Sequence, residues 1–362
     1  MGEKRARGLK KSKESQKKVK TEEEEETVVL EIHGQNDMDE LEQLFTSALA
    51  QLDEDNAEQA ILLFRGVIHE CDKMLRVRKE GVPDATEEEK AVIEESIKSC
   101  PVLPYSFYVT YANGLYYLSL IEDISNEDKI GLLEHGLELL EQAEELEKHE
   151  SIPHAACRLI LQKSVLKNEP IPKEFHDQVD LLLASKNIPN LLEIFQLSNG
   201  YTDILESAEK KIEWTETNAK NWQKVVKLDK ENEKCFIGLG NCFLGLADDL
   251  IQLQEEAEDV KNEQVVPYLQ KAINAFKEAV KIQSKKTDLE KSTQINLLLF
   301  LGESLVNMGN LTDIDDDGAD NSESQKHYAE AVETFEKVLE LDSAALPEHF
   351  EEFLSQWKQD FE

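Results

Sequence analysis

The 362-residue sequence has no cysteine pair at the spacing of a zinc or redox motif and no long hydrophobic run. An odd number of scattered cysteines favours reduced thiols, as in the cytosol or nucleus. The longest apolar run, near Leu297–Leu301, is far too short to cross a bilayer. No apolar stretch follows the basic start, so we expect a soluble intracellular protein that is not secreted. The five cysteines are Cys71, Cys100, Cys157, Cys235 and Cys242.

Catalytic signatures are also missing. The sequence has no Ser/His/Asp order, paired-carboxylate context or phosphate-binding loop. Gly238, Gly240 and Gly245 superficially resemble a dinucleotide loop, but no strand precedes them, so we interpret them as points where helices approach closely. His69 and His154 lack companion ligands at metal spacing. We expect a non-enzyme with no cofactor and no metal.

The segment Asp313–Gly318 resembles the start of a calcium-binding loop. Such a loop needs a bidentate glutamate at its twelfth position to complete the coordination sphere. Here Ser324 occupies that position, and Glu323 lies one place early. We therefore interpret the segment as an acidic surface insertion.

Acidic residues dominate the composition, with 76 Asp and Glu against 40 Lys and Arg and a net charge of −36. Residues 1–20 hold nine of the basic residues and only two acidic ones, which leaves residues 21–362 with a charge of −43. A body this acidic repels nucleic acid and anionic membranes and attracts basic proteins. We therefore expect no direct contact with nucleic acid or membrane.

Residues 1–36 are predicted to be a disordered tail, because neither its basic start nor the run Glu22–Glu26 has an apolar face to bury. The short run Val28–Ile32 is expected to pack on the helices. The basic residues are typical of a bipartite nuclear-localisation cluster that binds an import receptor. A solvated end or a nucleic-acid arm are the alternatives. The cluster consists of Lys4, Arg5, Lys10, Lys11, Lys17, Lys18 and Lys20.

Residues 37–362 are predicted to be an α-helical repeat domain. In Tyr268–Ile282 the spacing of Ala272, Phe276 and Ala279 is typical of the second helix of a tetratricopeptide pair. Leu239-Gly240-x2-Phe243 matches the first helix, and Leu301-Gly302-x2-Leu305 repeats it. We expect an all-α, tetratricopeptide-like solenoid with degenerate helix pairs at 235–282 and 295–341. A candidate sub-boundary lies near 168–200.

Three further predictions concern single segments. Ala85–Lys98 and Thr202–Leu228 are expected to be helical. The aromatic segment Tyr105–Tyr117 is expected to form core rather than a peptide groove. The tryptophans Trp214, Trp222 and Trp357 are interface candidates if they are exposed.

Several stretches resemble the fungal family called enhancer of translation termination, which includes the negative regulator of a prolyl-hydroxylase-type 2-oxoglutarate oxygenase. They span almost the full length, and the block in Gly66–Arg76 is the most specific. The similar residues are Lys4-Arg5-x2-Gly8-Leu9-x-Lys11, Gly66-Val67-Ile68-His69-Glu70-Cys71-Asp72-x-Met74-Leu75-Arg76, Leu301-Gly302, Met308-Gly309-Asn310-Leu311 and Glu352-Phe353-Leu354.

The resemblance implies a non-catalytic nuclear protein, with the cytoplasm as an additional location. It implies that the chain binds the oxygenase and brings it into the nucleus. There it would restrain the effect of the oxygenase on a sterol-regulatory transcription factor under low oxygen. A link to translation termination, through ribosomal or termination proteins, is also implied. From composition alone, the alternative is an acidic chaperone for basic nuclear or ribosomal proteins.

Overall fold

A computed structural model describes residues 37–81, 102–205, 207–256, 261–286, 290–313 and 322–361, together with Thr86, Lys90, Ile97 and Lys98. These residues are helical or in turns, with no strand among them. The predicted tail, Val28–Ile32, most of Ala85–Lys98, Cys100 and all but the first residue of Asp313–Gly318 lie outside the described residues.

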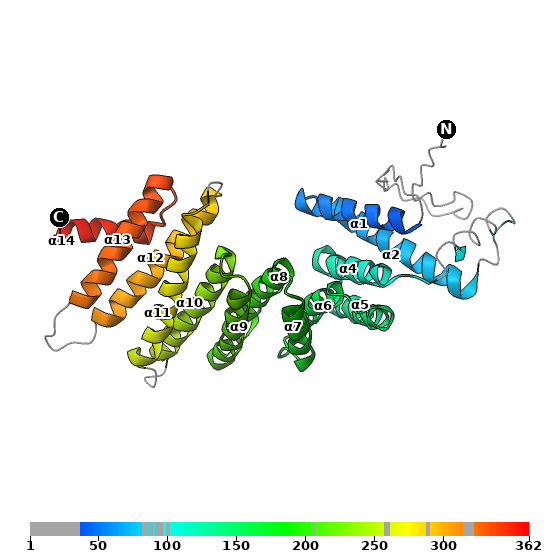
Figure 1. The fold of residues 1–362 in the computed structure, drawn as a ribbon, viewed down its shortest axis with the longest axis horizontal. Coiled ribbons are helices and arrows are strands. Elements are labelled where there is room, and N and C mark those ends of the chain that lie inside the picture. Colours follow the sequence, from blue (N-terminus) through cyan, green and yellow to red (C-terminus); the bar gives the residue numbers. More distant parts are fainter. Residues whose placement is uncertain are drawn as a thin grey trace. The chain divides into compact units, whose positions relative to one another are not determined.

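The chain forms two compact units, Met1–Gln178 and Val179–Glu362. In each, most helices that follow one another in sequence pack side by side, such as α4 with α5 and α10 with α11 (Figure 1). The first unit contains α1 (Asp37–Asp53), α2 (Ala57–Glu80), α4 (Tyr105–Ile121), α5 (Asn126–Leu146) and α6 (Ser151–Lys167), and α7 (Lys173–Ser185) includes the division. The second contains α8 (Ile188–Asn199), η1 (Gly200–Ile204), α9 (Ala208–Leu228), α10 (Glu233–Glu256), α11 (Asn262–Gln283), α12 (Lys291–Asp313), α13 (Ser322–Leu341) and α14 (Glu348–Phe361).

Polar caps set several helix boundaries. The Ser125 side chain accepts a hydrogen bond from the backbone N–H of Asp128 at the start of α5. The predicted single helix over Thr202–Leu228 is wrong. The short 3₁₀ helix η1 ends at Ile204, and α9 begins only after Ser207, whose side chain accepts from the Lys210 N–H. A serine that caps the backbone here is more favourable than one inside a helix.

Aromatic rings pack directly on glycines in the second unit. A Cβ added to Gly240 of α10 would lie 2.4 Å from the Phe276 ring of α11. A Cβ on Gly302 of α12 would lie 2.3 Å from the Phe335 ring of α13. Both rings are fully buried. The two glycines and the two phenylalanines therefore interlock the helix pairs α10/α11 and α12/α13, and the all-α, tetratricopeptide-like prediction is confirmed.

The first unit is held together by aromatic and cation–π contacts. The Phe64 and Tyr117 rings stack at 5.2 Å between centroids. The buried Arg158 places its guanidinium 4.4 Å from the Tyr116 ring centroid and 4.7 Å from that of Tyr117. Phe107, Tyr111 and Tyr116 are buried, so the prediction of core is confirmed for these three. Tyr105, Tyr108 and Tyr117 are half-buried.

Helix α10 departs from the expectation that no segment could span a membrane. Among the described residues it alone is long and apolar enough to do so, by length and composition, over Glu233–Gln254. Its buried residues include Leu239, Phe243 and Leu246, and it packs against α9 and α11. A helix that is buried in the core of a protein is as apolar as a membrane-spanning helix. The packing of α10 against its neighbours therefore accounts for its apolar composition.

The glycine contacts predict a contrast between two substitutions in α10. Gly240→Ala should lower the free energy of unfolding by about 1–3 kcal/mol, because the methyl group overpacks against Phe276. Gly245→Ala is the matched control, because no atom lies within 4 Å of its added Cβ. It should leave stability unchanged or raise it by up to about 1 kcal/mol, since alanine favours helix. Denaturant unfolding measures both, and equal effects would contradict the interlocking.

Candidate partner-binding surfaces

Three carboxylates gather on α10 and α12 of the second unit. We name Asp248, Asp249 and Glu303 the acidic cluster. Asp249 and Glu303 are half-buried, and Asp248 keeps part of its surface exposed although protein atoms displace much of the water around its carboxyl group. Asp248 and Asp249 are the only charged residues in the stretch 235–253 of α10. Asp248 and Asp249 therefore place two charges inside an otherwise uncharged stretch of α10.

The surroundings of the acidic cluster favour the uncharged carboxylic acids. Partial burial, followed by the charges of Glu303 and Asp249, raises the pKa of Asp248 to about 7. Burial also raises the pKa of Asp249, against the opposing effect of Lys211, and that of Glu303, against the opposing effect of His349. Carboxylates held in this way lack sufficient positive charge within the protein, and a bound cation would stabilise them.

Asn241 lies two turns before Asp248 on the same face of α10, because seven residues make close to two helical turns. Its Oδ1 is buried and accepts no hydrogen bond from the protein. A buried acceptor without a donor is unfavourable. The Asp248 and Asp249 carboxylates of α10 accept hydrogen bonds, which suits a ligand rich in N–H donors such as Lys or Arg.

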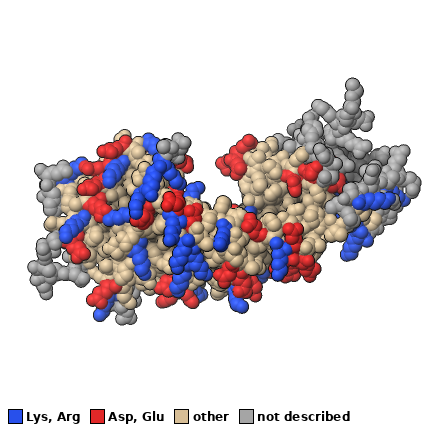
Figure 2. Space-filling model, in the orientation of Figure 1, with Lys and Arg blue, Asp and Glu red and all other residues tan. Residues whose placement is uncertain are grey.

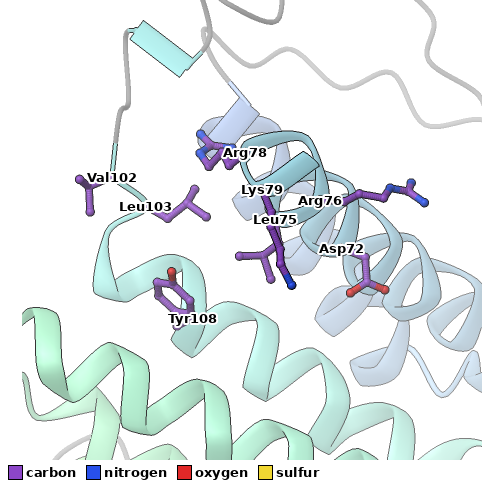
Figure 3. A pocket seen from close by; sticks show the side chains of 8 residues that line it. All are labelled: Asp72, Leu75, Arg76, Arg78, Lys79, Val102, Leu103 and Tyr108. Carbon is purple, nitrogen blue, oxygen red and sulfur yellow. The ribbon is translucent and has the colours of Figure 1, made fainter. Parts of the chain in front are cut away.

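A pocket of about 780 Å³ lies in the first unit, between the last turns of α2 and the start of α4 (Figure 3). We name it the basic pocket because it carries three cations and one carboxylate. Figure 3 shows Leu75 pointing from α2 toward Leu103 and Tyr108, whereas Arg76 and Asp72 extend from the other side of α2. The lining residues are Asp72, Leu75, Arg76, Arg78, Lys79, Val102, Leu103 and Tyr108.

The one carboxylate of the basic pocket already has a partner. The Tyr111 hydroxyl donates a hydrogen bond to Asp72. Burial and this bond raise the pKa of Tyr111, which therefore stays protonated as the donor. Next to it, burial raises the pKa of the Cys71 thiol, so Cys71 is a packed side chain and not a nucleophile.

The structure describes only some of the residues that the sequence indicated as binding sites. The basic cluster Lys4, Arg5, Lys10, Lys11, Lys17, Lys18 and Lys20 lies outside the described residues. Trp214 and Trp222 are buried and therefore do not meet the condition for interface candidates, and the Trp214 indole donates to the Ser198 carbonyl oxygen. Trp357 is half-buried, close to the Tyr328 ring.

The acidic cluster and the basic pocket were not predicted. The sequence contains one signal for the cluster, namely two adjacent aspartates in an apolar helix. The block Gly66–Arg76 contributes Asp72, Leu75 and Arg76 to the basic pocket, but its spacing does not reveal that Val102, Leu103 and Tyr108 complete it. The visible face in Figure 2 shows acidic and basic side chains interleaved rather than one uniformly acidic surface.

Comparison with known proteins gives one family and two related structures. The family model described as nuclear pore complex subunit Nro1 matches residues 1–265. The structure of the S. pombe nuclear import adaptor Nro1 is 14% identical, with a TM-score of 0.52, and the match covers 89% of this chain and 98% of that one.

A second Nro1 structure, reported as the hypoxic regulator of sterol synthesis and a nuclear import adaptor, is also 14% identical. Its TM-score is 0.51, and the match covers 89% of this chain and 93% of that one. At this identity both structures show the shared fold alone. No curated protein matches the chain.

The raised pKa of Asp248 predicts a pH-dependent effect of Asp248→Asn. The raised native pKa favours the folded state below the unfolded value of 3.8, and this contribution is lost as pH rises through about 7. Asp248→Asn removes the unfavourable charge, so it should raise the free energy of unfolding at pH 8 more than at pH 5. Denaturant unfolding at both pH values measures this, with Asp53→Asn, an exposed position in the first unit, as the control. A gain that is the same at both pH values would contradict the assignment.

Proposed function

This chain belongs to the Nro1 family, and we propose that it is a non-catalytic nuclear import adaptor. The observation that carries the proposal is the family match, which includes the basic start of the chain and more than two thirds of its length. A helical-repeat fold supports a binding role, because such folds present extended surfaces to partners. The related protein from S. pombe is itself described as a nuclear import adaptor.

We propose that the acidic cluster holds the cargo. The three carboxylates lie close together and are partly removed from water, which is unfavourable for their charged forms in the unbound protein. The raised pKa values of Asp248, Asp249 and Glu303 reflect this cost. A lysine or arginine of a partner removes this repulsion and donates hydrogen bonds to the carboxylates. The C-terminal unit is therefore suited to a partner with a basic surface.

The cargo we propose is a prolyl-hydroxylase-type 2-oxoglutarate oxygenase, which the family resemblance implies. Binding would carry the oxygenase into the nucleus and restrain its effect on a sterol-regulatory transcription factor. The description of a relative as a hypoxic regulator of sterol synthesis supports this direction. The implied link to translation termination would follow from occupancy, because a bound oxygenase cannot reach other substrates.

The basic cluster of the tail is proposed to engage the import receptor. Its lysines precede an acidic body, so they form the one strongly basic block of the sequence. Import receptors recognise such blocks. The cargo would then bind near α10 and α12, and the import receptor would bind within residues 4–20, far away in the sequence.

The second candidate function is an acidic chaperone for basic nuclear or ribosomal proteins. The charge of −43 over residues 21–362 favours it. A chaperone of this kind binds through long-range charge and accepts many clients, whereas an adaptor holds one cargo by close contacts. Raising NaCl from about 0.1 M to about 1 M shortens the Debye length from about 10 Å to about 3 Å. One cargo that stays bound supports the adaptor, and a broad set of basic clients lost with salt supports the chaperone.

Two variants separate import from cargo binding in cells. Replacing Lys10, Lys11, Lys17, Lys18 and Lys20 by Ala should leave the oxygenase bound but both proteins cytoplasmic. The triple variant Asp248→Asn, Asp249→Asn, Glu303→Gln should enter the nucleus without the oxygenase. Fluorescence imaging of both tagged proteins, with a pull-down, measures the two effects.

The matched control removes three exposed glutamates of the first unit, Glu127→Gln, Glu145→Gln and Glu147→Gln. It changes the net charge equally and should import the oxygenase normally. Oxygenase import that persists in the triple variant of the acidic cluster would contradict the cargo site. Import that fails equally in the control would show that overall charge, and not the cluster, is responsible.

A further inference from the structure

The basic pocket is an anomaly in a chain of net charge −36. Arg76 and Lys79 are exposed at its edge. The half-buried Arg78 donates from Nη1 to the Met74 carbonyl oxygen at 3.1 Å and is fixed to its own helix. Since the Tyr111 hydroxyl already binds Asp72, Arg76 and Lys79 are the groups that an incoming ligand would meet. The pocket therefore fits an anionic ligand.

The lining also has an apolar part. Leu75 and Leu103 line the pocket, and Val102 next to them is 65% exposed. The volume of about 780 Å³ lies within the range of about 300–1,000 Å³ that is usual for binding pockets. Apolar walls with cations at the edge match glutamate side chains, because their methylene groups pack on carbon while the carboxylates reach the cations.

The N-terminal tail joins the described structure close to this pocket. α1 and α2 are connected by a short turn and pack against each other, and an added Cβ on Gly66 would lie 3.4 Å from Leu44. The two helices run antiparallel, with Leu44 opposite Gly66. The residue seven positions before Leu44, Asp37, therefore lies opposite the residue seven positions after Gly66, which is Lys73. Arg76 is then less than one helical turn further along α2.

We propose that the basic pocket is the docking site of the chain's own glutamate run, Glu22–Glu26. Ten residues separate Glu26 from Asp37, and ten extended residues span up to about 35 Å. This distance exceeds several turns of helix, so the run reaches the pocket easily. Five consecutive carboxylates complement the cations at Arg76 and Lys79.

Tethering favours this occupant over an acidic segment of another protein. A short flexible linker gives an attached segment an effective concentration of about 1 mM. The lysines of the basic cluster directly precede the glutamate run, so docking holds Lys17, Lys18 and Lys20 near the surface of the first unit. An acidic partner that displaces the run would release them. The proposal does not rest on the import function.

Binding of a fluorescent hexaglutamate peptide to the full-length protein tests the proposal. Replacing Glu22–Glu26 by Gln should empty the pocket and tighten peptide binding. The gain should be about tenfold for a tethered competitor at about 1 mM whose own Kd is about 0.1 mM. The charge-matched control replaces five other glutamates, Glu87, Glu88, Glu89, Glu94 and Glu95, by Gln. It should bind the peptide as weakly as the original protein. Fluorescence anisotropy at low ionic strength measures all three affinities.

A third variant ties the effect to the pocket. Adding Arg76→Ala and Lys79→Ala to the Glu22–Glu26 variant should abolish the gain in peptide affinity. Carbodiimide cross-linking of the unaltered protein at micromolar concentration should join Lys79 to the glutamate run within one chain. Equal peptide affinity with and without the run would overturn the proposal. So would a gain that appears in the charge-matched control, or one that survives the loss of Arg76 and Lys79.

Discussion

The contact of an aromatic ring with a glycine on the neighbouring helix is the constraint on which the second unit depends. Phe276 lies on Gly240 and Phe335 on Gly302, and Trp222 of α9 lies in the same way on Gly238 of α10. Without a Cβ at these positions the helices approach closely enough for the rings to be buried. Because α10 and α12 both pack on α11 and contact each other, the same interlocking brings Asp248 and Asp249 near Glu303.

The acidic cluster is costly for a protein that carries a large negative charge. Like charges that are partly removed from water destabilise the folded state. The raised pKa values of the three carboxyl groups reflect this destabilisation. Residues that break local rules of stability often belong to functional sites. The cluster and the unsatisfied Asn241 oxygen are such residues. A cationic partner would stabilise the carboxylates of the cluster, so binding and folding would be coupled in the second unit.

Most of the helices could be predicted from the sequence, because their apolar spacing, caps and glycines are local signals. The Ala272/Phe276/Ala279 spacing predicted the second helix of a pair, and Gly240 predicted its close neighbour. The break between η1 and α9 was missed because Ser207 had to be recognised as a cap inside an apparently continuous pattern. Trp214 and Trp222 could not be placed, since burial depends on tertiary packing. The basic pocket was missed for the same reason: α2 and the residues before α4 form it only when folded.

In the proposed complex, the second unit binds a basic partner through α10 and α12. Hydrogen–deuterium exchange of the full chain, with and without the bound oxygenase, tests it most directly. The account predicts that binding slows exchange in the backbone around Asp248 and Asp249 and around Glu303, because a partner that covers the acidic cluster also stabilises these helices. Protection confined to α1–α6, or no protection in the presence of bound oxygenase, would contradict it.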